Sequence, residues 1–200
     1  MELRVKKIKF YVAERSPPPK GRICKANVLN VERCEEKRTA FHNIISLLPQ
    51  DRIYYIDECG INSYIYREHA YAKRGVKVTS GISGKKFKRA NIVAAKCGDS
   101  IVAPMIYDGT TDSTLFEYWF EHCLLKSISP GSYCIMDNAA FHRKSKLHIL
   151  ASRADCAVIF LPPYSPDLNP IESYWAWLKQ RLRKTLPSYD GFMDALCGCF

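Results

Sequence analysis

The order of short apolar runs and helical patterns along this chain limits the folds that it can adopt. Five runs are rich in aliphatic, β-branched or aromatic residues, as strands are: residues 52–57, 90–95, 100–107, 133–137 and 157–161. The second and third runs flank Gly98-Asp99, and we expect them to form a hairpin. Helical patterns precede the first run and follow the third, fourth and fifth. The sequence therefore predicts an α/β fold with a mixed central sheet and flanking helices.

The helical patterns have identifiable boundaries. Apolar residues recur at helical spacing from Phe41 to Leu48, and Pro49 ends the pattern. Thr111 or Asp112 is expected to open a second helix, whose broad apolar face we interpret as core. Residues 142–150 are interpreted as a partly basic helix. In the last helix, Asn169 is a good N-cap and Pro170 suits the first helical position.

Three acidic residues occupy positions where these elements would hold a carboxylate rigidly. Asp57 ends the first run, Asp137 ends the fourth, and Glu172 lies in the first turn of the last helix. Asp137 would therefore lie at the carboxyl end of a strand, where α/β sheets usually present their sites. Because side chains alternate along a strand, only one of Asp57 and Glu58 can face a given site, and we choose Asp57.

Each of these acids also has an ordinary structural explanation. Glu172 could close a capping box by accepting a hydrogen bond from the Asn169 N–H. Asp57 and Asp137 could be turn residues at strand ends. The joint pattern favours a shared site, because all three acids occur at compatible places in one succession of strands and helices. Carboxylates are hard oxygen ligands that suit Mg²⁺ or Mn²⁺, and such a trio is typical of two-metal phosphodiester sites.

Basic residues exceed acidic ones and concentrate in two segments. The formal net charge of +10 and the pI near 9.2 favour a polyanionic partner. One segment, Arg67 to Arg89, contains glycines and is interpreted as a flexible loop or ribbon. The other lies on the helix of Glu172, where basic residues on the same face could hold a phosphate backbone or could be an ordinary solvated surface. The candidate DNA-binding residues are Lys73, Arg74, Lys85, Lys86, Lys88, Arg89, Lys179 and Arg183.

Composition argues against several other classes of protein. The 200 residues, 47% of them hydrophobic, are enough for one well-packed domain. No apolar stretch approaches the roughly 18 residues of a membrane helix, and we expect no secretory segment, because no apolar region follows the basic start. The nine cysteines contain no Cys-x-x-Cys pair, which argues against zinc. Reduced thiols in an intracellular, DNA-associated protein are expected.

Three segments of the chain match known motifs. They are Tyr55-Ile-Asp57-Glu58, Met136-Asp137-Asn138-Ala139 followed by His142, and Leu161-Pro-Pro-Tyr-Ser-Pro-Asp-Leu-Asn-Pro-Ile-Glu172. Together they resemble the catalytic core of a DDE transposase of the mariner-type insertion-sequence superfamily. The resemblance covers roughly residues 34–186, and its last motif is highly specific. The second and third acids are separated by 34 residues, 138–171, a gap that many members of the superfamily share.

The resemblance implies an RNase H-like fold in which Asp57, Asp137 and Glu172 are the catalytic, metal-binding triad. The strands of the two aspartates would be neighbours, with the helix of Glu172 packed across them. Two Mg²⁺ or Mn²⁺ ions would lie about 3.5 to 4 Å apart, with Asp57 bridging them, Asp137 on one and Glu172 on the other. The implied activity is hydrolysis of DNA at element ends, followed by attack of the new 3′-hydroxyl on target DNA. Supporting roles are assigned to Asn138, His142, Tyr164 and Asn169.

The resemblance leaves the assembly open. Residues 60–88 form an irregular insertion in the position of a loop that contacts a partner subunit in relatives, which favours a homodimer on DNA. We expect residues 1–33 to be an irregular segment or linker and residues 34–200 to be the catalytic domain, with an abrupt end that resembles an unfinished helix. Relatives carry helix-turn-helix modules ahead of the core, for which the residues before Cys34 are too few. The alternatives are one part of a split transposase, a stand-alone metal nuclease, and a non-catalytic basic DNA-binding remnant.

Overall fold

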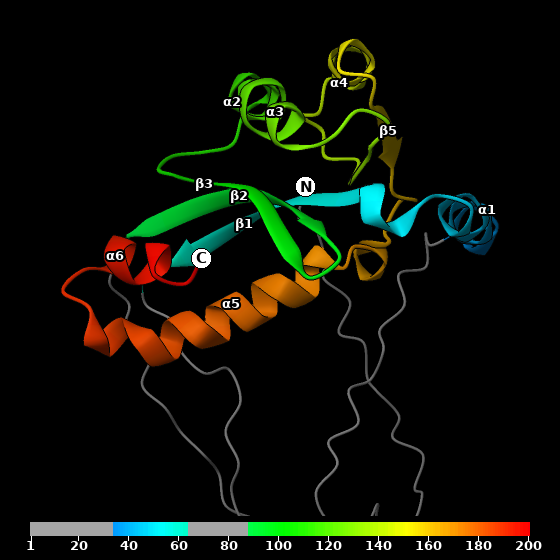
Figure 1. The fold of residues 1–200 in the computed structure, drawn as a ribbon. Helices are drawn as coiled ribbons and strands as arrows, with labels where there is room; N and C mark the ends of the chain where they lie inside the picture. The colour runs from blue at the N-terminus through cyan, green and yellow to red at the C-terminus, as the bar shows by residue number, and fades with distance from the viewer. Residues whose placement is uncertain (1–33, 64–87) are drawn as a thin grey trace, which may run out of the picture. The chain divides into compact units, whose positions relative to one another are not determined.

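A five-stranded sheet with the strand order β3-β2-β1-β4-β5 lies at the centre of the fold. The computed structural model describes residues 34–63 and 88–200, which belong to one compact unit, Val31–Phe200. The strands are β1 (Ile53–Asn62), β2 (Arg89–Cys97), β3 (Ser100–Tyr107), β4 (Tyr133–Met136) and β5 (Ala157–Phe160). β1 pairs antiparallel with β2 and parallel with β4, and β4 pairs parallel with β5. This arrangement confirms the expected mixed sheet, which Figure 1 shows, and the expected pairing of the strand of Asp57 with the strand before Asp137.

Helices lie on both faces of this sheet. They are α1 (Glu35–Ser46), α2 (Ser113–Trp119), α3 (Leu125–Ser127), α4 (Lys144–Arg153), α5 (Ile171–Thr185) and α6 (Phe192–Cys197). A π-helical segment, η2 (Phe120–Leu124), joins α2 to α3, and short 3₁₀ turns form η1 (Gln50–Arg52), η3 (Pro166–Leu168) and η4 (Leu186–Ser188). Figure 1 shows α5 and α6 on one face of the sheet and α2, α3 and α4 on the other.

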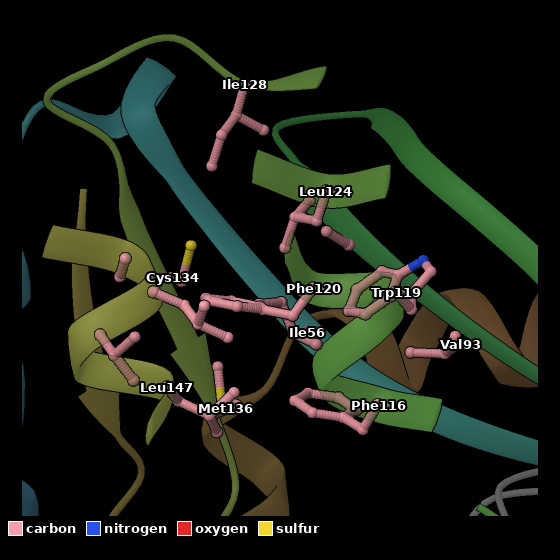
Figure 2. Packing of buried hydrophobic residues seen from close by; sticks show 14 residues of the cluster. Ile56, Val93, Phe116, Trp119, Phe120, Leu124, Ile128, Cys134, Met136 and Leu147 are labelled. Carbon is pink, nitrogen blue, oxygen red and sulfur yellow. The ribbon is translucent and has the colours of Figure 1, made fainter. Parts of the chain in front are cut away.

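Three apolar clusters fill the space between the sheet and its helices, and the smallest joins Phe41 of α1 to Ile53 and Ile135 of the strands. On the α2 face, Ile56 and Met136 from the strands meet Phe116, Phe120 and other buried side chains of the helices (Figure 2). On the α5 face, Cys59 and Ile92 meet Trp175 and Leu178. Ile56 and Cys59 belong to different clusters because their positions in β1 differ by an odd number, which places their side chains on opposite faces. The same alternation separates Asp57 from Glu58.

The predicted hairpin and second helix are both present. β2 and β3 pair antiparallel around Gly98, whose φ of +53° suits a glycine in a tight turn. Asp112 is the N-cap of α2, and its side chain accepts a hydrogen bond of 2.8 Å from the Leu115 N–H. The helix then packs Phe116 and Trp119 into the α2 face of the sheet, which confirms that its apolar stripe is core.

β1 is longer than expected, so the prediction that Asp57 ends a strand is wrong. The strand runs ten residues, to Asn62, and pairs with β2 through Gly60 and beyond. Gly60 continues the strand with the guanidinium of Arg89 against it, in the space that a Cβ would occupy. The predicted insertion at 60–88 therefore begins no earlier than Ser63, and residues 64–87 lie outside the described ranges, as do residues 1–33.

The state of the cysteines and the character of the helices can be given for the described residues. All cysteines in residues 34–63 and 88–200 are free thiols. Within the same ranges, no helix has the length and apolar character needed to cross a lipid bilayer.

Candidate active site

Asp57 lies on β1, and Asp137 directly follows β4, the parallel neighbour of β1. The last aligned pair of β1 and β4 is Tyr55 with Ile135, so two further residues along each strand lead to Asp57 and Asp137. Neighbouring strands are about 4.8 Å apart, and residues at matched positions face the same side. Asp137 follows the last residue of β4, as the sequence predicted, whereas Asp57 lies in the middle of β1. The sheet thus brings together two acids that are distant in sequence.

The third acid, Glu172, lies in the first turn of α5, which packs across β1. Two hydrogen bonds join this helix and the turn before it to β1. Trp175 Nε1 donates to Asp57 Oδ2 at 2.9 Å, and Asn169 Nδ2 donates to the carbonyl oxygen of Ile56 at 3.1 Å. Glu172 lies between these two anchors along the chain. The expected packing of the Glu172 helix across the strand of Asp57 is therefore confirmed.

The predicted N-cap of α5 is wrong. The helix has Pro170 at its N-cap with no side-chain cap, and the Asn169 side chain is turned toward β1. The capping-box explanation of Glu172 fails too, because the Asn169 N–H donates to the carbonyl oxygen of Pro166 at 2.9 Å. Asn169 is 4% exposed, and its amide satisfies a carbonyl of β1 instead of a helix end. Its role is to fasten the motif to the sheet.

The electrostatics of Asp57 indicate crowding of negative charge. Burial raises the pKa of the Asp57 carboxyl, and the nearby Glu172 and Asp137 carboxylates add to this, so that the pKa is about 7 against an ordinary value of 3.8. The hydrogen bond from Trp175 acts in the opposite direction. A cation placed between these carboxylates would offset the part of the pKa shift that comes from their repulsion.

Glu58 points to the other face of the sheet, as alternation along β1 requires. Burial raises its pKa to about 8, and the charges of Asp57 and Asp137 contribute. Its Oε1 atom is buried and has no hydrogen-bond partner among the described residues. Of these two acids, only Asp57 shares a face with α5 and lies near Glu172.

His142 holds the Asp137 carboxylate from the loop that follows β4. Its Nε2 lies 3.2 Å from Asp137 Oδ1, and its ring lies 4.3 Å, centroid to centroid, from both Phe116 and Phe141. This contact, with burial acting against it, lowers the pKa of the Asp137 carboxyl, and the Ala139 N–H donates to the same oxygen at 2.9 Å. The expectation that His142 begins a helix is wrong, because α4 starts at Lys144 and the ring is buried in the preceding loop.

A groove of about 430 Å³ runs beside Asp137. Its walls are Asn138, Ala139 and the proline-rich segment 161–166, which includes the half-exposed Tyr164. Asn138 fixes one wall by donating to the Leu161 carbonyl oxygen and accepting from Lys144 Nζ. On the far side of the loop, Arg38 of α1 forms two hydrogen bonds with Asp167, at 3.0 and 2.7 Å. The loop before Glu172 is thus held at both ends.

The three acids fit a divalent cation by the chemistry of their oxygens. Carboxylates are the ligands that Mg²⁺ and Mn²⁺ prefer, and the negative charges of Glu172 and Asp137 lie close enough to Asp57 to raise its pKa further than burial does alone. In residues 34–63 and 88–200, no three His, Cys, Asp or Glu side chains are already arranged as a metal-ligand group. The side chains therefore lie near one another without being drawn to a common point.

The candidate DNA-binding residues divide into two groups. Lys73, Arg74, Lys85 and Lys86 lie outside the described ranges. Lys88 and Arg89 are exposed at the start of β2, where Arg89 Nε donates to Asn91 Oδ1 at 3.3 Å. Lys179 and Arg183 are half-buried and lie two and three turns after Glu172 on the same side of α5. That these basic residues hold DNA stays a prediction.

Comparisons with known proteins agree with this geometry. A family model described as DDE superfamily endonuclease matches residues 52–192, which span all three acids. The structure of the Mos1 transposase paired-end complex with left transposon end is similar with a TM-score of 0.62 and 17% identity, over 82% of this chain and 54% of that one. A pre-cleavage Mos1 transpososome has a TM-score of 0.60 and 15% identity, over 90% of this chain and 64% of that one.

One curated relative is similar in sequence. It is the uncharacterized protein y4pE/y4sA of Sinorhizobium fredii (strain NBRC 101917 / NGR234), 32% identical over 82 residues, which are 38% of this chain and 56% of that protein. The chain thus spans between about half and two thirds of the length of these relatives. The Mos1 likeness establishes an RNase H-like fold, and the family model covers most of the chain. The chain therefore belongs to the DDE superfamily endonucleases.

Proposed function

We propose that this chain is the catalytic domain of a transposase that cleaves DNA at the ends of a mobile element and joins the new 3′ ends to target DNA. The observation that carries the proposal is the convergence of Asp57 on β1, Asp137 directly after β4 and Glu172 on the crossing helix, where the charges of Glu172 and Asp137 both raise the pKa of Asp57. The family supports nuclease chemistry in general. Similar structures include Mos1 complexes with a transposon end and a Mos1 strand transfer complex, which favours transposition over simple hydrolysis.

The three carboxylates are the residues that would hold two Mg²⁺ or Mn²⁺ ions. When bound, such ions lower the pKa of an attacking water or 3′-hydroxyl and stabilise the leaving oxygen of an in-line displacement. Similar Mos1 paired-end complexes contain Mn in one case and Mg in another. In this chain, His142 would keep the Asp137 carboxylate turned toward the site.

Basic residues beside the triad would hold the DNA. Lys179 and Arg183 continue the side of α5 that carries Glu172, so a phosphate backbone bound there would pass the carboxylates. Lys88 and Arg89 would extend this surface from the start of β2. Homodimer formation on DNA is part of the proposal, because a transposase must hold two element ends together.

The test is nicking of supercoiled plasmid in Mg²⁺ or Mn²⁺. Wild type is expected to nick, whereas Asp137→Asn and Glu172→Gln should each lose activity with an unchanged circular dichroism spectrum. Glu36→Gln is the matched control, because Glu36 is exposed and occupies the same position in the first turn of α1 that Glu172 occupies in α5. Full nicking by Asp137→Asn would remove Asp137 from the mechanism.

Two further outcomes separate the alternatives. Joining of labelled 3′ ends to a second DNA distinguishes a transposase from a stand-alone nuclease, which would stop at cleavage. A wild-type protein that binds DNA and never nicks it in either metal would support the non-catalytic, basic DNA-binding remnant.

A further inference from the structure

Trp175 contributes an unusual contact to the candidate site. Its side chain is 2% exposed and lies in the α5-face cluster with Ile92, Ala94 and Leu178. An indole has one polar group, the N–H, and here it donates to Asp57 Oδ2 at 2.9 Å. Trp175 lies one helical turn after Glu172. The helix α5 therefore supplies one candidate metal ligand, Glu172, and through Trp175 also holds a second one, Asp57.

The bond works together with that of Asn169. Asn169 and Trp175 lie three residues before and three residues after Glu172, and they bond consecutive residues of β1, Ile56 and Asp57. Two anchors on either side of Glu172 fix both the distance of α5 from β1 and its position along the strand. The separation of Glu172 from Asp57 is therefore set by these two hydrogen bonds as well as by apolar packing.

The bond also fixes the orientation of the Asp57 carboxylate. An ionised carboxylate has about four lone-pair sites, and the indole occupies one of them. The remaining sites stay available to a cation, while rotation about the side-chain bonds is restrained. A preformed orientation reduces the ordering that a metal ion must impose when it binds.

Trp119 shows what a buried indole does where no site is present. It is 0% exposed, and its N–H donates to the carbonyl oxygen of Ala103 at 2.7 Å, on the α2 face of the sheet. Both indoles are buried and both are hydrogen bonded. Of the two, the Trp175 indole is the one that donates its hydrogen bond to a charged side chain of the candidate site.

We propose that Trp175 is a positioning residue, whose indole N–H holds the Asp57 carboxylate in the orientation and at the separation from Glu172 that a divalent cation requires. This inference rests on the proposed function, because it assumes that the triad binds metal. It assigns to Trp175 a role in metal affinity that packing alone would not give.

The test compares Trp175→Phe with Trp119→Phe by titration calorimetry with Mn²⁺ alone. Each variant keeps an aromatic ring and loses one buried indole N–H, so both are expected to melt at similarly lower temperatures in EDTA. Outer ligand-positioning groups typically change metal affinity by about 10 to 100-fold, and we expect Trp175→Phe to bind Mn²⁺ at least about 10-fold more weakly than wild type. Trp119→Phe should bind as wild type does. Equal affinities in the two variants would overturn the inference.

A second measurement keeps Trp175 in place. In Trp119→Phe/Trp177→Phe, Trp175 is the remaining tryptophan of the chain, and paramagnetic Mn²⁺ bound beside Asp57 should quench its fluorescence. Adding Asp57→Asn to that variant should abolish the quenching. Quenching that persists at the same Mn²⁺ concentration would show that the ion binds elsewhere and would overturn the inference.

The proposed function and the role of Trp175 fail in distinguishable ways. If wild type binds no Mn²⁺, both are refuted. If wild type binds Mn²⁺ and nicks DNA while Trp175→Phe retains full affinity, only the role of Trp175 is refuted. Nicking by Trp175→Phe that recovers at high Mn²⁺, with none in Asp57→Asn, is the result expected of a positioning residue.

Discussion

Replacing Asp57 with asparagine is expected to stabilise the metal-free protein while abolishing its activity. Asparagine keeps a side-chain oxygen that can accept the hydrogen bond from Trp175, and it removes the negative charge that lies near Glu172 and Asp137. The variant therefore distinguishes two effects of the Asp57 carboxylate. One is the free energy that its charge costs the folded protein, and the other is its contribution to binding a cation.

The magnitude follows from the pKa of Asp57, which rises from 3.8 to about 7. Each pKa unit corresponds to about 1.4 kcal/mol, so ionising Asp57 in the folded state costs up to about 4 kcal/mol near pH 8. Partial solvation of the carboxyl, and burial of the new amide group, reduce the expected gain to about 1–3 kcal/mol.

The sign of the pH dependence is fixed by the direction of the shift. A carboxyl with a raised pKa in the folded state binds its proton more tightly there than in the unfolded chain. Its contribution to stability is fully present below pH 3.8 and is lost as the pH rises through about 7. Wild type should therefore lose stability over this range, and Asp57→Asn should lose less. Glu58, whose pKa is raised to about 8, also makes the folded protein less stable as the pH rises, and it does so in both proteins.

The assay is urea denaturation in EDTA at about pH 5 and about pH 8. Asp57→Asn should exceed wild type at the higher pH, and the difference should shrink at the lower one. Mn²⁺ should raise the stability of wild type and leave the variant unchanged, since only binding to the folded state adds stability. The reasoning is refuted if the variant is no more stable than wild type at about pH 8.

Three further substitutions test how the fold holds the site. Asp167→Ala removes both hydrogen bonds to the buried Arg38 guanidinium and should cost about 1–3 kcal/mol in urea denaturation, whereas an unchanged midpoint would mean that the pair adds nothing. Phe120→Ala leaves a cavity in the fully buried α2-face cluster and should cost about 3–5 kcal/mol; a loss under about 1 kcal/mol would contradict that packing. Gly60→Ala should displace the flexible end of Arg89 and cost no more than about 1 kcal/mol in urea denaturation, and a large loss would show that the β1 backbone itself had moved.

Much of the fold was predictable because its signals are local. The hairpin of β2 and β3 follows from apolar runs on either side of Gly98, and the start of α2 follows from Asp112 before an apolar face. The position of Asp137 after β4 was also readable from a short run that ends in an acid. Each of these features depends on residues that are neighbours in the chain.

The length of β1 and the start of α5 were not predictable in the same way. A glycine soon after two acids usually suggests a turn, yet Gly60, which follows Cys59, continues a strand that pairs with β2, and Arg89 of β2 occupies the space beside it. Asn169 has the residue type of an N-cap, yet its amide bonds a carbonyl of β1 that lies 113 residues away in sequence. In both places a tertiary contact outweighs the local preference.

The sequence by itself determined which acids could form a site, since residue type, alternation along a strand and position in a helix are properties of the chain. Only the tertiary structure decided how those acids are held. The buried ring of His142 beside Asp137 and the indole of Trp175 on Asp57 are contacts between side chains that have no common pattern in the sequence. Trp175 and Asp57 are 118 residues apart, and their hydrogen bond exists because α5 packs on the face of β1 from which Asp57 projects.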